Sequence, residues 1–394
     1  MKTALLKAAL FTPMPGGAWG LPILIKGSPG TGKTATIEAI GAQWGMPVEV
    51  LSPGERGEGA FGVTPVPVQN GEITLSYPPP DWVKHLRRTV DGKTEEQGIV
   101  FVDEMSSSPP ALQPALLGLV QARRIGGHQL GPRVRVLGAC NPVSQAANGW
   151  DLAPPVANRL GHVDWPSPEA DEWADWISGG AQAVLPAGSA DAEEARVLAA
   201  WPEAYGRACA LVGSVLRRRP ELLCKMPPDG DPAQSAAWPS PRTWEYAARA
   251  LASGWVHGLT GIEQDEMVQA FVGQAAGGEL GAWIDEQDLP LPAAVLDGTV
   301  AWKPDPRRLD RTEAVLSSCA ALVKSNPEKR DARLGALWKI LLDVSKDAKD
   351  VAVPSMKVLV KSGLDRDAAK KLRPDAQKAL ANVHDVFMAA GGAA

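Results

Sequence analysis

The strongest chemical signal in the chain is a glycine-rich loop that ends in Lys-Thr. Gly27–Thr34 has the sequence GSPGTGKT and fits the pattern G-x-x-x-x-G-K-[ST] at every fixed position. The glycines let the backbone curl so that several N–H groups point at phosphate oxygens, and a following helix adds the positive end of its dipole. Lys33 brings a cation to the β- and γ-phosphates, and Thr34 presents a hydroxyl to Mg²⁺. The candidate nucleotide-binding residues are therefore Gly27, Ser28, Pro29, Gly30, Thr31, Gly32, Lys33 and Thr34.

Two acidic residues and one amide follow apolar runs further along the chain. Asp103 and Glu104 come directly after the run IVFV, and Asn141 comes after the run that ends at Cys140. Asp103 is suited to hold Mg²⁺ through water, and Glu104 is suited to orient and deprotonate an attacking water. The Asn141 amide could bond the γ-phosphate or that water without adding charge. An isolated Asp-Glu pair is most often solvated surface charge, and an Asn before Pro often starts a turn, so these roles depend on the fold.

Strand and helix patterns alternate over the first 168 residues. Four apolar runs are continuous rather than alternating, and helical spacing separates them, which indicates a parallel sheet covered on both faces. The sequence therefore predicts an α/β doubly wound domain in which the polar strand ends lie side by side. The predicted strands are 21–25, 47–51, 98–102 and 133–140, and the predicted helices are 34–44 and 109–123.

Helical periodicity dominates the rest of the chain. Residues 169–300 are predicted to form an α-helical domain, and residues 301–394 are predicted to form two or three further helices after a proline-punctuated linker. The last segment has 18 Lys+Arg against 12 Asp+Glu, whereas residues 1–300 have 22 against 33. Its lysines are interleaved with aspartates, which favours a solvated helical face over a nucleic-acid surface. The helices predicted in the middle segment are 192–200, 204–218, 240–253 and 263–276.

Composition places the chain among ordinary globular proteins. It has 394 residues, 45% hydrophobic and 22% charged, which is enough for two or three domains. Its four scattered cysteines form no C-x-x-C pair, which argues against a disulfide scaffold or zinc ribbon and fits a reducing cytosol. Its apolar runs are far below the ~18 residues of a membrane span. Residues 1–10 are predicted to be a short amphipathic helix rather than a signal peptide, because Lys7 interrupts their apolar part, so we expect a cytoplasmic protein.

The order of these motifs resembles the AAA+ ATPases and, within them, the MoxR family, over about residues 5–260. Gly27–Thr34 matches Walker A, Ile99–Glu104 matches Walker B, and Asn141 matches sensor 1. Arg159, in Asn-Arg-Leu, resembles the arginine finger, and Arg242, in Ser-Pro-Arg, resembles sensor 2. The sequence departs from the family pattern just before the finger, where Asn158 replaces Asp.

The resemblance implies a fold and a nucleotide site. The fold is an AAA+ P-loop doubly wound parallel sheet domain over 1–168, followed by an α-helical lid over 169–300 and a C-terminal helical extension over 301–394. ATP and Mg²⁺ would bind between the first two parts, with Thr34 and Asp103 toward the metal.

Catalysis, as the resemblance implies it, is in-line attack of water on ATP. Glu104 would act as the base and Asn141 would position the water. Lys33 and Arg242 would act on the phosphates within the same chain.

An arginine from a neighbouring subunit implies a homo-oligomeric ring, expected to be a hexamer. Such an arginine neutralises charge that develops on the γ-phosphate, and its fixed charge and bidentate geometry favour Arg over Lys. Arg159 is the expected residue, and Arg123 or Arg124 could serve instead. The resemblance further implies a chaperone-like role, in which the ATPase remodels or activates a partner protein, often one with a von Willebrand factor A domain.

Three other functions remain open at this point. A nucleic-acid motor or accessory ATPase would need a basic pore, whereas residues 1–300 are net acidic. A nucleotide-gated scaffold would bind ATP with little turnover, which the intact Glu104 disfavours. A small-molecule kinase would carry different residues at the positions of Asn141, Arg159 and Arg242.

Two segments of the sheet domain could face the pore of a ring. Residues 54–63 are glycine-rich and carry Phe61, which could grip a threaded partner or belong to a surface loop. Tyr77 and Trp82 present the same choice between gripping a partner and packing on their own subunit. The five histidines show no ligand spacing and are predicted to be structural.

Overall fold

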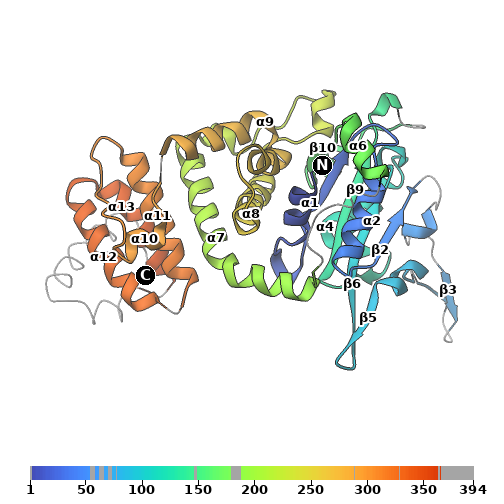
Figure 1. Ribbon diagram of the computed structural model, residues 1–394, viewed down its shortest axis with the longest axis horizontal. Helices are drawn as coiled ribbons and strands as arrows, with labels where there is room; N and C mark the ends of the chain where they lie inside the picture. Colours follow the sequence, from blue (N-terminus) through green and yellow to red (C-terminus); the bar gives the residue numbers. More distant parts are fainter. Residues whose placement is uncertain are drawn as a thin grey trace. The chain divides into compact units, whose positions relative to one another are not determined.

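The computed structural model divides the described chain into two compact units (Figure 1). Unit 1 comprises residues 1–199 and 222–278, and unit 2 comprises residues 200–221 and 279–394. Residues 222–278, which the sequence assigns to a helical lid, thus lie in the same unit as the sheet. The described residues are 2–53, 58–61, 66–69, 73–76, 78–145, 149–178, 188–287, 289–327, 329–362 and 364.

A mostly parallel sheet forms the centre of unit 1. Its parallel strands lie in the order β10-β1-β9-β6-β2, and β5 pairs with β6 in the antiparallel direction. The buried, continuous apolar run of β9 agrees with this parallel pairing, and the predicted α/β class is confirmed. The strands are β1 (Ile23–Lys26), β2 (Val48–Leu51), β5 (Arg87–Val90), β6 (Lys93–Val102), β9 (Arg133–Cys140) and β10 (Gly161–Asp164). Two hairpins lie outside this sheet, β3 (Val66–Gln69) with β4 (Ile73–Ser76) and β7 (Arg124–Ile125) with β8 (His128–Gln129).

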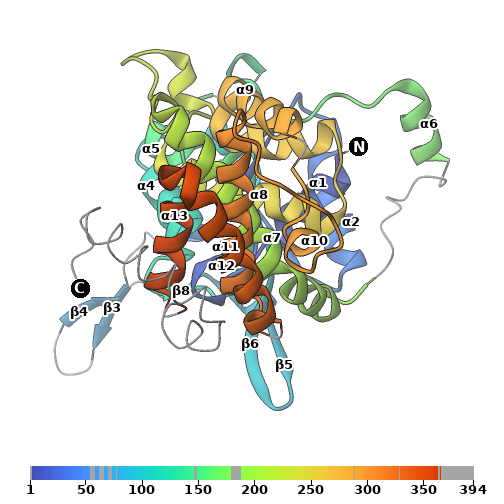
Figure 2. The same cartoon turned by 90° about the vertical axis from the view of Figure 1, so that its left-hand side faces the viewer.

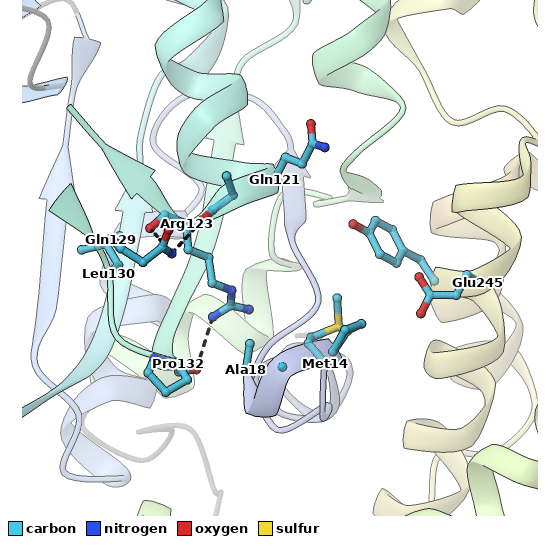
Figure 3. A pocket seen from close by; sticks show the side chains of 12 residues that line it. Met14, Ala18, Gln121, Arg123, Gln129, Leu130, Pro132 and Glu245 are labelled. Carbon is cyan, nitrogen blue, oxygen red and sulfur yellow. Dashed lines mark hydrogen bonds between the residues drawn. The ribbon is translucent and has the colours of Figure 1, made fainter. Parts of the chain in front are cut away.

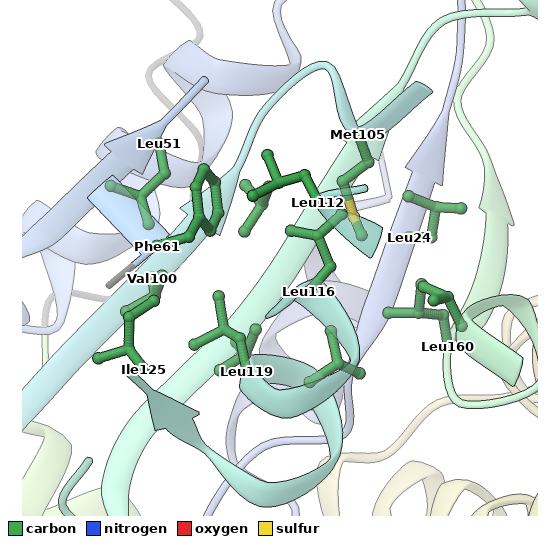
Figure 4. Close-up of a cluster of buried hydrophobic side chains, with 14 of the residues drawn as sticks. Leu24, Leu51, Phe61, Val100, Met105, Leu112, Leu116, Leu119, Ile125 and Leu160 are labelled. Atoms are coloured by element: carbon green, nitrogen blue, oxygen red, sulfur yellow. The ribbon is translucent and has the colours of Figure 1, made fainter. Parts of the chain in front are cut away.

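Helices next to the sheet pack with the strands in the core of unit 1. α2 (Lys33–Gln43) follows β1, and α4 (Gln113–Ala122) follows β6. Leu116 and Leu119 of α4 join Leu24 of β1 in one buried cluster, which Figure 4 shows between the helix and the strands. This packing fixes the strand ends that carry the polar residues.

Phe61 belongs to the same buried cluster. Its side chain is only 1% exposed, and Figure 4 places it near Leu51 at the end of β2. The alternative that Phe61 is an exposed residue gripping a partner is therefore wrong for this chain. Trp82 is also buried and donates its indole N–H to the carbonyl of Ala60 at 2.9 Å, whereas Tyr77 lies outside the described residues.

Two helices from distant parts of the sequence pack together in unit 1. α1 (Thr3–Leu10) packs against α8 (Pro241–His257) and buries Leu5, Leu6 and Leu10, so the predicted amphipathic helix is a core helix. α8 starts with a capping box at Ser240 and ends at Gly258, whose φ of 72° suits glycine. The other helices of unit 1 are α5 (Pro154–Ala157) and α6 (Ala170–Ile177), whereas α7 (Ala190–Arg218) and α9 (Ile262–Gln287) have residues in both units. The helices predicted at 192–200 and 204–218 are one helix, with Pro202 inside it.

Unit 2 has a core of its own. Trp338, Leu337 and Leu341 lie fully or almost fully buried at its centre. Arg333 forms two hydrogen bonds of 2.8 Å with the carboxylate of Asp297, which lower the pKa of that carboxyl. Its helices are α10 (Pro292–Leu296), α11 (Leu309–Ser325), α12 (Arg330–Asp347) and α13 (Lys349–Lys361). Across both units, the described helices include none that is long and apolar enough to span a membrane.

Candidate active site

The loop Gly27–Thr34 connects β1 to α2 at the carboxyl edge of the sheet. Gly27 lies so close to the segment after β10 that a Cβ would come 2.4 Å from the carbonyl oxygen of Trp165, and Gly32 has a φ of 81°. Both positions therefore require glycine. The Trp165 indole also donates to the carbonyl of Thr31 at 3.1 Å, which ties the loop to β10. The sequence folds here as its glycine spacing predicts.

Lys33 lies at the centre of this edge. Its ammonium donates to the carbonyls of Gly27 and Ser28, each at 2.9 Å, and to Oδ1 of Asn141 at 3.0 Å. Burial lowers the pKa of Lys33, while the nearby charge of Asp103 opposes that shift. The structure therefore brings Asn141, from the end of β9, to the lysine of the loop.

Thr34 and Asp103 form the second contact at this edge. The Thr34 hydroxyl donates to Oδ2 of Asp103 at 2.5 Å, and the backbone N–H of Glu104 donates to Oδ1 at 2.8 Å. A hydroxyl beside a carboxylate is an oxygen donor set that suits Mg²⁺. The residues predicted as metal ligands thus lie side by side.

Glu104 has an unusual backbone conformation. Its φ of 54° and ψ of 42° lie in the left-handed region, which is uncommon for a residue other than glycine. The residue is exposed and comes directly after Asp103 at the end of β6. The charge of Glu104 also opposes the lowering of the Lys33 pKa by burial, so the carboxylate acts at the same edge of the sheet. Strained residues cluster at functional sites, which supports the predicted role of this side chain.

The two predicted arginines form a separate group. Arg159 donates through Nε to Gln121 Oε1 at 2.6 Å and through a terminal nitrogen to the Pro155 carbonyl at 2.5 Å. Partial burial lowers the pKa of Arg159, and the positive charge of Arg242 lowers it further. Within the described residues, no hydrogen bond joins Arg159 or Arg242 to the loop Gly27–Thr34.

Asn158 connects these two arginine-bearing segments. Its Oδ1 accepts a hydrogen bond from the Ser240 hydroxyl at 2.8 Å, and its Nδ2 donates to the Trp238 carbonyl at 3.1 Å. The side chain is buried. The Asn-Arg-Leu and Ser-Pro-Arg segments, 82 residues apart, are therefore joined by the residue that departs from the family pattern.

Arg123 has a structural role. Its guanidinium donates to the carbonyls of Val134, Trp19 and Gly20, and also to that of Pro132 at 3.5 Å, the contact drawn in Figure 3. Burial lowers its pKa to about 10. Figure 3 shows Arg123 beside a cavity of about 460 Å³ that Met14 and Glu245 also line. Arg124, by contrast, is exposed at the start of β7.

Sequence reasoning missed a second polar pair beside the loop. A cavity of about 460 Å³ lies next to Gly27 and Asn141, and Lys26 and Asp164 line it. Burial lowers the pKa of Lys26, and the charge of Asp164 counteracts that shift. Both residues end parallel strands. Polar residues at strand ends were the signal that identified Asp103, and the same signal could have identified Lys26 and Asp164. However, β10 is too short and too polar to be predicted as a strand.

Comparison with known proteins agrees with this geometry. Residues 23–148 match the model of the ATPase family associated with various cellular activities (AAA). One similar solved structure is a proposed ATPase from Cytophaga hutchinsonii, with 14% identity, a TM-score of 0.42 and coverage of 71% of this chain and 78% of that chain. That likeness is too weak to carry an argument. No curated protein matches the chain.

The matched segment contains the loop Gly27–Thr34 together with Asp103 and Asn141. This chain therefore carries an AAA ATPase domain, and the resemblance to AAA+ ATPases is confirmed at that level. The family supports ATP as the nucleotide and ATPase activity in general terms. Arg159 and Arg242 lie outside the matched residues.

Proposed function

We propose that this chain is a Mg²⁺-dependent ATPase of the MoxR type, located in the cytoplasm, that assembles into a ring and remodels or activates a partner protein. The observation that supports the ATPase part is the convergence of Lys33, Asn141, Thr34 and Asp103 at one edge of the sheet. Four residues from three separate sequence segments meet where a triphosphate would lie. The AAA match supports the nucleotide, and the ring follows from the usual assembly of this family.

Phosphate binding would use the hydrogen bonds that the loop now makes to itself. The Lys33 ammonium donates to two loop carbonyls and to Asn141. The β- and γ-phosphates of ATP would replace those carbonyls as stronger, charged acceptors. The Asn141 amide would remain beside the γ-phosphate, because it already contacts the same ammonium.

Thr34 and Asp103 fit a Mg²⁺ ion. Their oxygens lie 2.5 Å apart and come from opposite sides of the site, the start of α2 and the end of β6. The ion, when bound, would neutralise negative charge on the β- and γ-phosphates. Asp103 also accepts the backbone N–H of Glu104, which positions that residue beside the metal ligand.

Glu104 would take a proton from the attacking water. The water oxygen then forms a bond to the γ-phosphorus, the bond to the β-phosphate oxygen breaks, and ADP and phosphate leave. The exposed position of Glu104 leaves room for water beside its carboxylate.

Arg159 is the better candidate for an arginine acting on a neighbouring subunit. The Arg123 guanidinium is committed to carbonyls of its own chain. Arg159 is only partly buried and lies near the charge of Arg242. Arg242 would act on the phosphates of its own chain after a movement of the start of α8, since its charge here acts on Arg159.

A phosphate-release assay tests the ATPase proposal. Glu104→Gln should keep ATP binding and lower steady-state turnover by about 100-fold or more, the usual size of a general-base effect. Glu38→Gln is a matched control, because Glu38 is an exposed glutamate on α2. Equal phosphate release by Glu104→Gln and the unaltered protein would show that Glu104 is not the general base. If neither protein turns over ATP, the nucleotide-gated scaffold is favoured.

The same variant tests whether the chain acts on a partner protein. A protein that cannot hydrolyse ATP should hold its client, so Glu104→Gln is used as bait in the native host and bound proteins are identified by mass spectrometry. A captured protein with a von Willebrand factor A domain supports the MoxR assignment. Stimulation of the unaltered protein's turnover by DNA or RNA would support the nucleic-acid motor instead.

A further inference from the structure

Glu104 is held in place by the turn that follows it. Its left-handed backbone conformation is one that a residue other than glycine keeps only where the surrounding structure holds it. A short helical turn, η4 (Met105–Ser107), follows at once, and the backbone N–H of Ser107 donates to the Glu104 carbonyl at 2.8 Å. The Glu104 residue is itself exposed, so its conformation depends on what the neighbouring residues contact.

Met105 buries its side chain against a glycine of the sheet. The residue is 1% exposed, and Figure 4 shows its side chain pointing into the buried cluster of unit 1, near Leu24. The sulfur lies so close to Gly138 that a Cβ on this glycine would come 2.2 Å from Sδ. A glycine inside a strand often marks such a close approach. We call the space that Gly138 leaves for the Met105 side chain the Gly138 notch.

The Gly138 notch belongs to the strand that leads to Asn141. Gly138 lies in β9, three residues before Asn141, and pairs in register with Val102 of β6. Glu104 follows the end of β6, whereas the side chain of the next residue, Met105, packs on β9. Met105 therefore connects the strand that carries the glutamate to the strand that carries the amide.

Ser106 makes a second connection between the same two strand ends. It is 3% exposed, its hydroxyl donates to the Asn141 carbonyl at 3.3 Å, and its own carbonyl accepts the backbone N–H of Trp150 at 2.7 Å. The first of these distances is long for a hydroxyl donor. The packing of Met105 is therefore the side-chain contact to which we give the main role in holding the turn.

We propose that Met105 is a positioning residue for ATP hydrolysis. From the Gly138 notch it holds the turn after Glu104 and thereby sets the Glu104 carboxylate relative to the Asn141 amide. The proposal rests on the proposed function, in which Glu104 is the general base and Asn141 positions the water. Both groups must act on the same water, so a small displacement of one of them lowers turnover without weakening nucleotide binding.

Steady-state phosphate release separates positioning from packing. Met105→Ala should lower kcat by about 10-fold or more and leave the KM for ATP within about three-fold. Leu119→Ala is the matched control, because Leu119 lies on α4 and is 0% exposed in the same cluster. This control should lose stability but keep its kcat. Met105→Leu, which nearly keeps the side-chain volume, should restore most of the turnover.

Two results of this assay would overturn the proposal. One is an unchanged kcat in Met105→Ala, and the other is an equal loss of kcat in Leu119→Ala. If Met105→Ala does not fold, Met105→Val is used in its place, because it withdraws the side chain from the Gly138 notch and keeps an apolar residue in the cluster. The same loss of kcat is then expected.

The effect of Met105 must disappear when residue 104 can no longer act as a base. In the Glu104→Gln background, Met105→Ala should change the residual turnover by less than about two-fold, because residues that act as a unit are not additive. A further loss of about 10-fold in that background would show that Met105 acts independently of Glu104, and the positioning role would be wrong.

Hydrogen exchange measured by mass spectrometry tests the turn without turnover. The backbone N–H groups of Ser107, Ser108 and Trp150 donate to carbonyls at or beside the turn. Met105→Ala should raise their exchange rates at least about 10-fold relative to Leu119→Ala, and equal rates would overturn the proposed contact. If the unaltered protein releases no phosphate, the proposed function and the role in hydrolysis fall together, while faster exchange would still show that Met105 holds the turn.

Discussion

Replacement of Asn158 by Asp restores the residue of the family that the sequence resembles, and the structure gives a reason why it should harm this chain. Asn158 is 4% exposed and uses both ends of its amide. Its Oδ1 accepts from the Ser240 hydroxyl, and its Nδ2 donates to the Trp238 carbonyl. A carbonyl only accepts hydrogen bonds, so the atom that faces Trp238 must carry a hydrogen. An ionised aspartate has none there.

The size of the effect follows from these contacts. Asn158→Asp replaces one donor to the Trp238 carbonyl by a carboxylate oxygen, a loss of about 1–3 kcal/mol although the Thr243 hydroxyl still donates to that carbonyl at 3.1 Å, and it also buries a charge. We expect about 3 kcal/mol of destabilisation at pH 7. Burial and the facing carbonyl oxygen should raise the pKa of the new carboxyl above ~3.9. Below that raised pKa the protonated acid can donate to Trp238, so the destabilisation should shrink as the pH falls and grow as it rises.

Urea unfolding at pH 7 and pH 4.5 measures this difference. The free energy of unfolding of Asn158→Asp is compared with that of the unaltered protein at each pH, so that other titrating groups cancel. Ser240→Ala removes the donor to Oδ1 and also the N-cap of α8, and should cost about 2 kcal/mol at both pH values. Equal stability of Asn158→Asp and the unaltered protein at pH 7 would refute the reasoning, and so would a deficit that is larger at pH 4.5.

Three further predictions concern the core and the site. Glu194→Ala leaves the guanidinium of Arg135, which is 0% exposed, without its carboxylate. The loss should lower the free energy of unfolding, measured with urea, by about 3–5 kcal/mol. The control Asp343→Ala, which breaks an exposed ion pair with Lys346, should leave the urea midpoint unchanged. Burial lowers the pKa of His162 to about 3, so the unfolded chain alone binds this proton between pH 6.5 and 3, and stability should fall by about 2–3 kcal/mol between neutral pH and pH 4.5. His162→Gln should flatten that part of the stability profile in urea titrations, and an unchanged slope would contradict the assignment. Asn141→Ala should lower phosphate release by about 100-fold and leave the calorimetric Kd for ATP within a few-fold, because Lys33 and the loop remain to bind the phosphates. Loss of ATP binding with retained turnover would reverse the roles.

Sequence reasoning succeeded where the chemistry is local or follows from strand order. The glycine spacing of Gly27–Thr34 needs only the strand before it and the helix after it. Asp103 and Asn141 come from the carboxyl ends of neighbouring parallel strands, β6 and β9, and such ends share one edge of the sheet. The pattern of continuous apolar runs therefore predicted that Asp103 and Asn141 lie at one edge of the sheet.

Reasoning from the sequence failed where a residue's environment is built from distant segments. Phe61 lies in a glycine-rich segment whose sequence is typical of a surface loop. In the structure, its side chain is buried in the hydrophobic cluster that contains Leu116 and Leu119 of α4. Arg123 and Arg124 are adjacent in the sequence, and only the position of the Trp19 and Val134 carbonyls makes the first structural and leaves the second exposed.

The sequence by itself determined the phosphate loop, the acidic strand end and the α/β class, because glycine conformation and apolar periodicity are properties of short stretches of chain. The tertiary structure alone decided that Arg123 bonds carbonyls from distant segments, that the amide of Asn158 joins two such segments, and that no residue of α6 is buried among the described residues. Each of these depends on hydrogen bonds or burial between residues that lie tens to hundreds of positions apart. No local pattern encodes the direction in which two such segments approach each other.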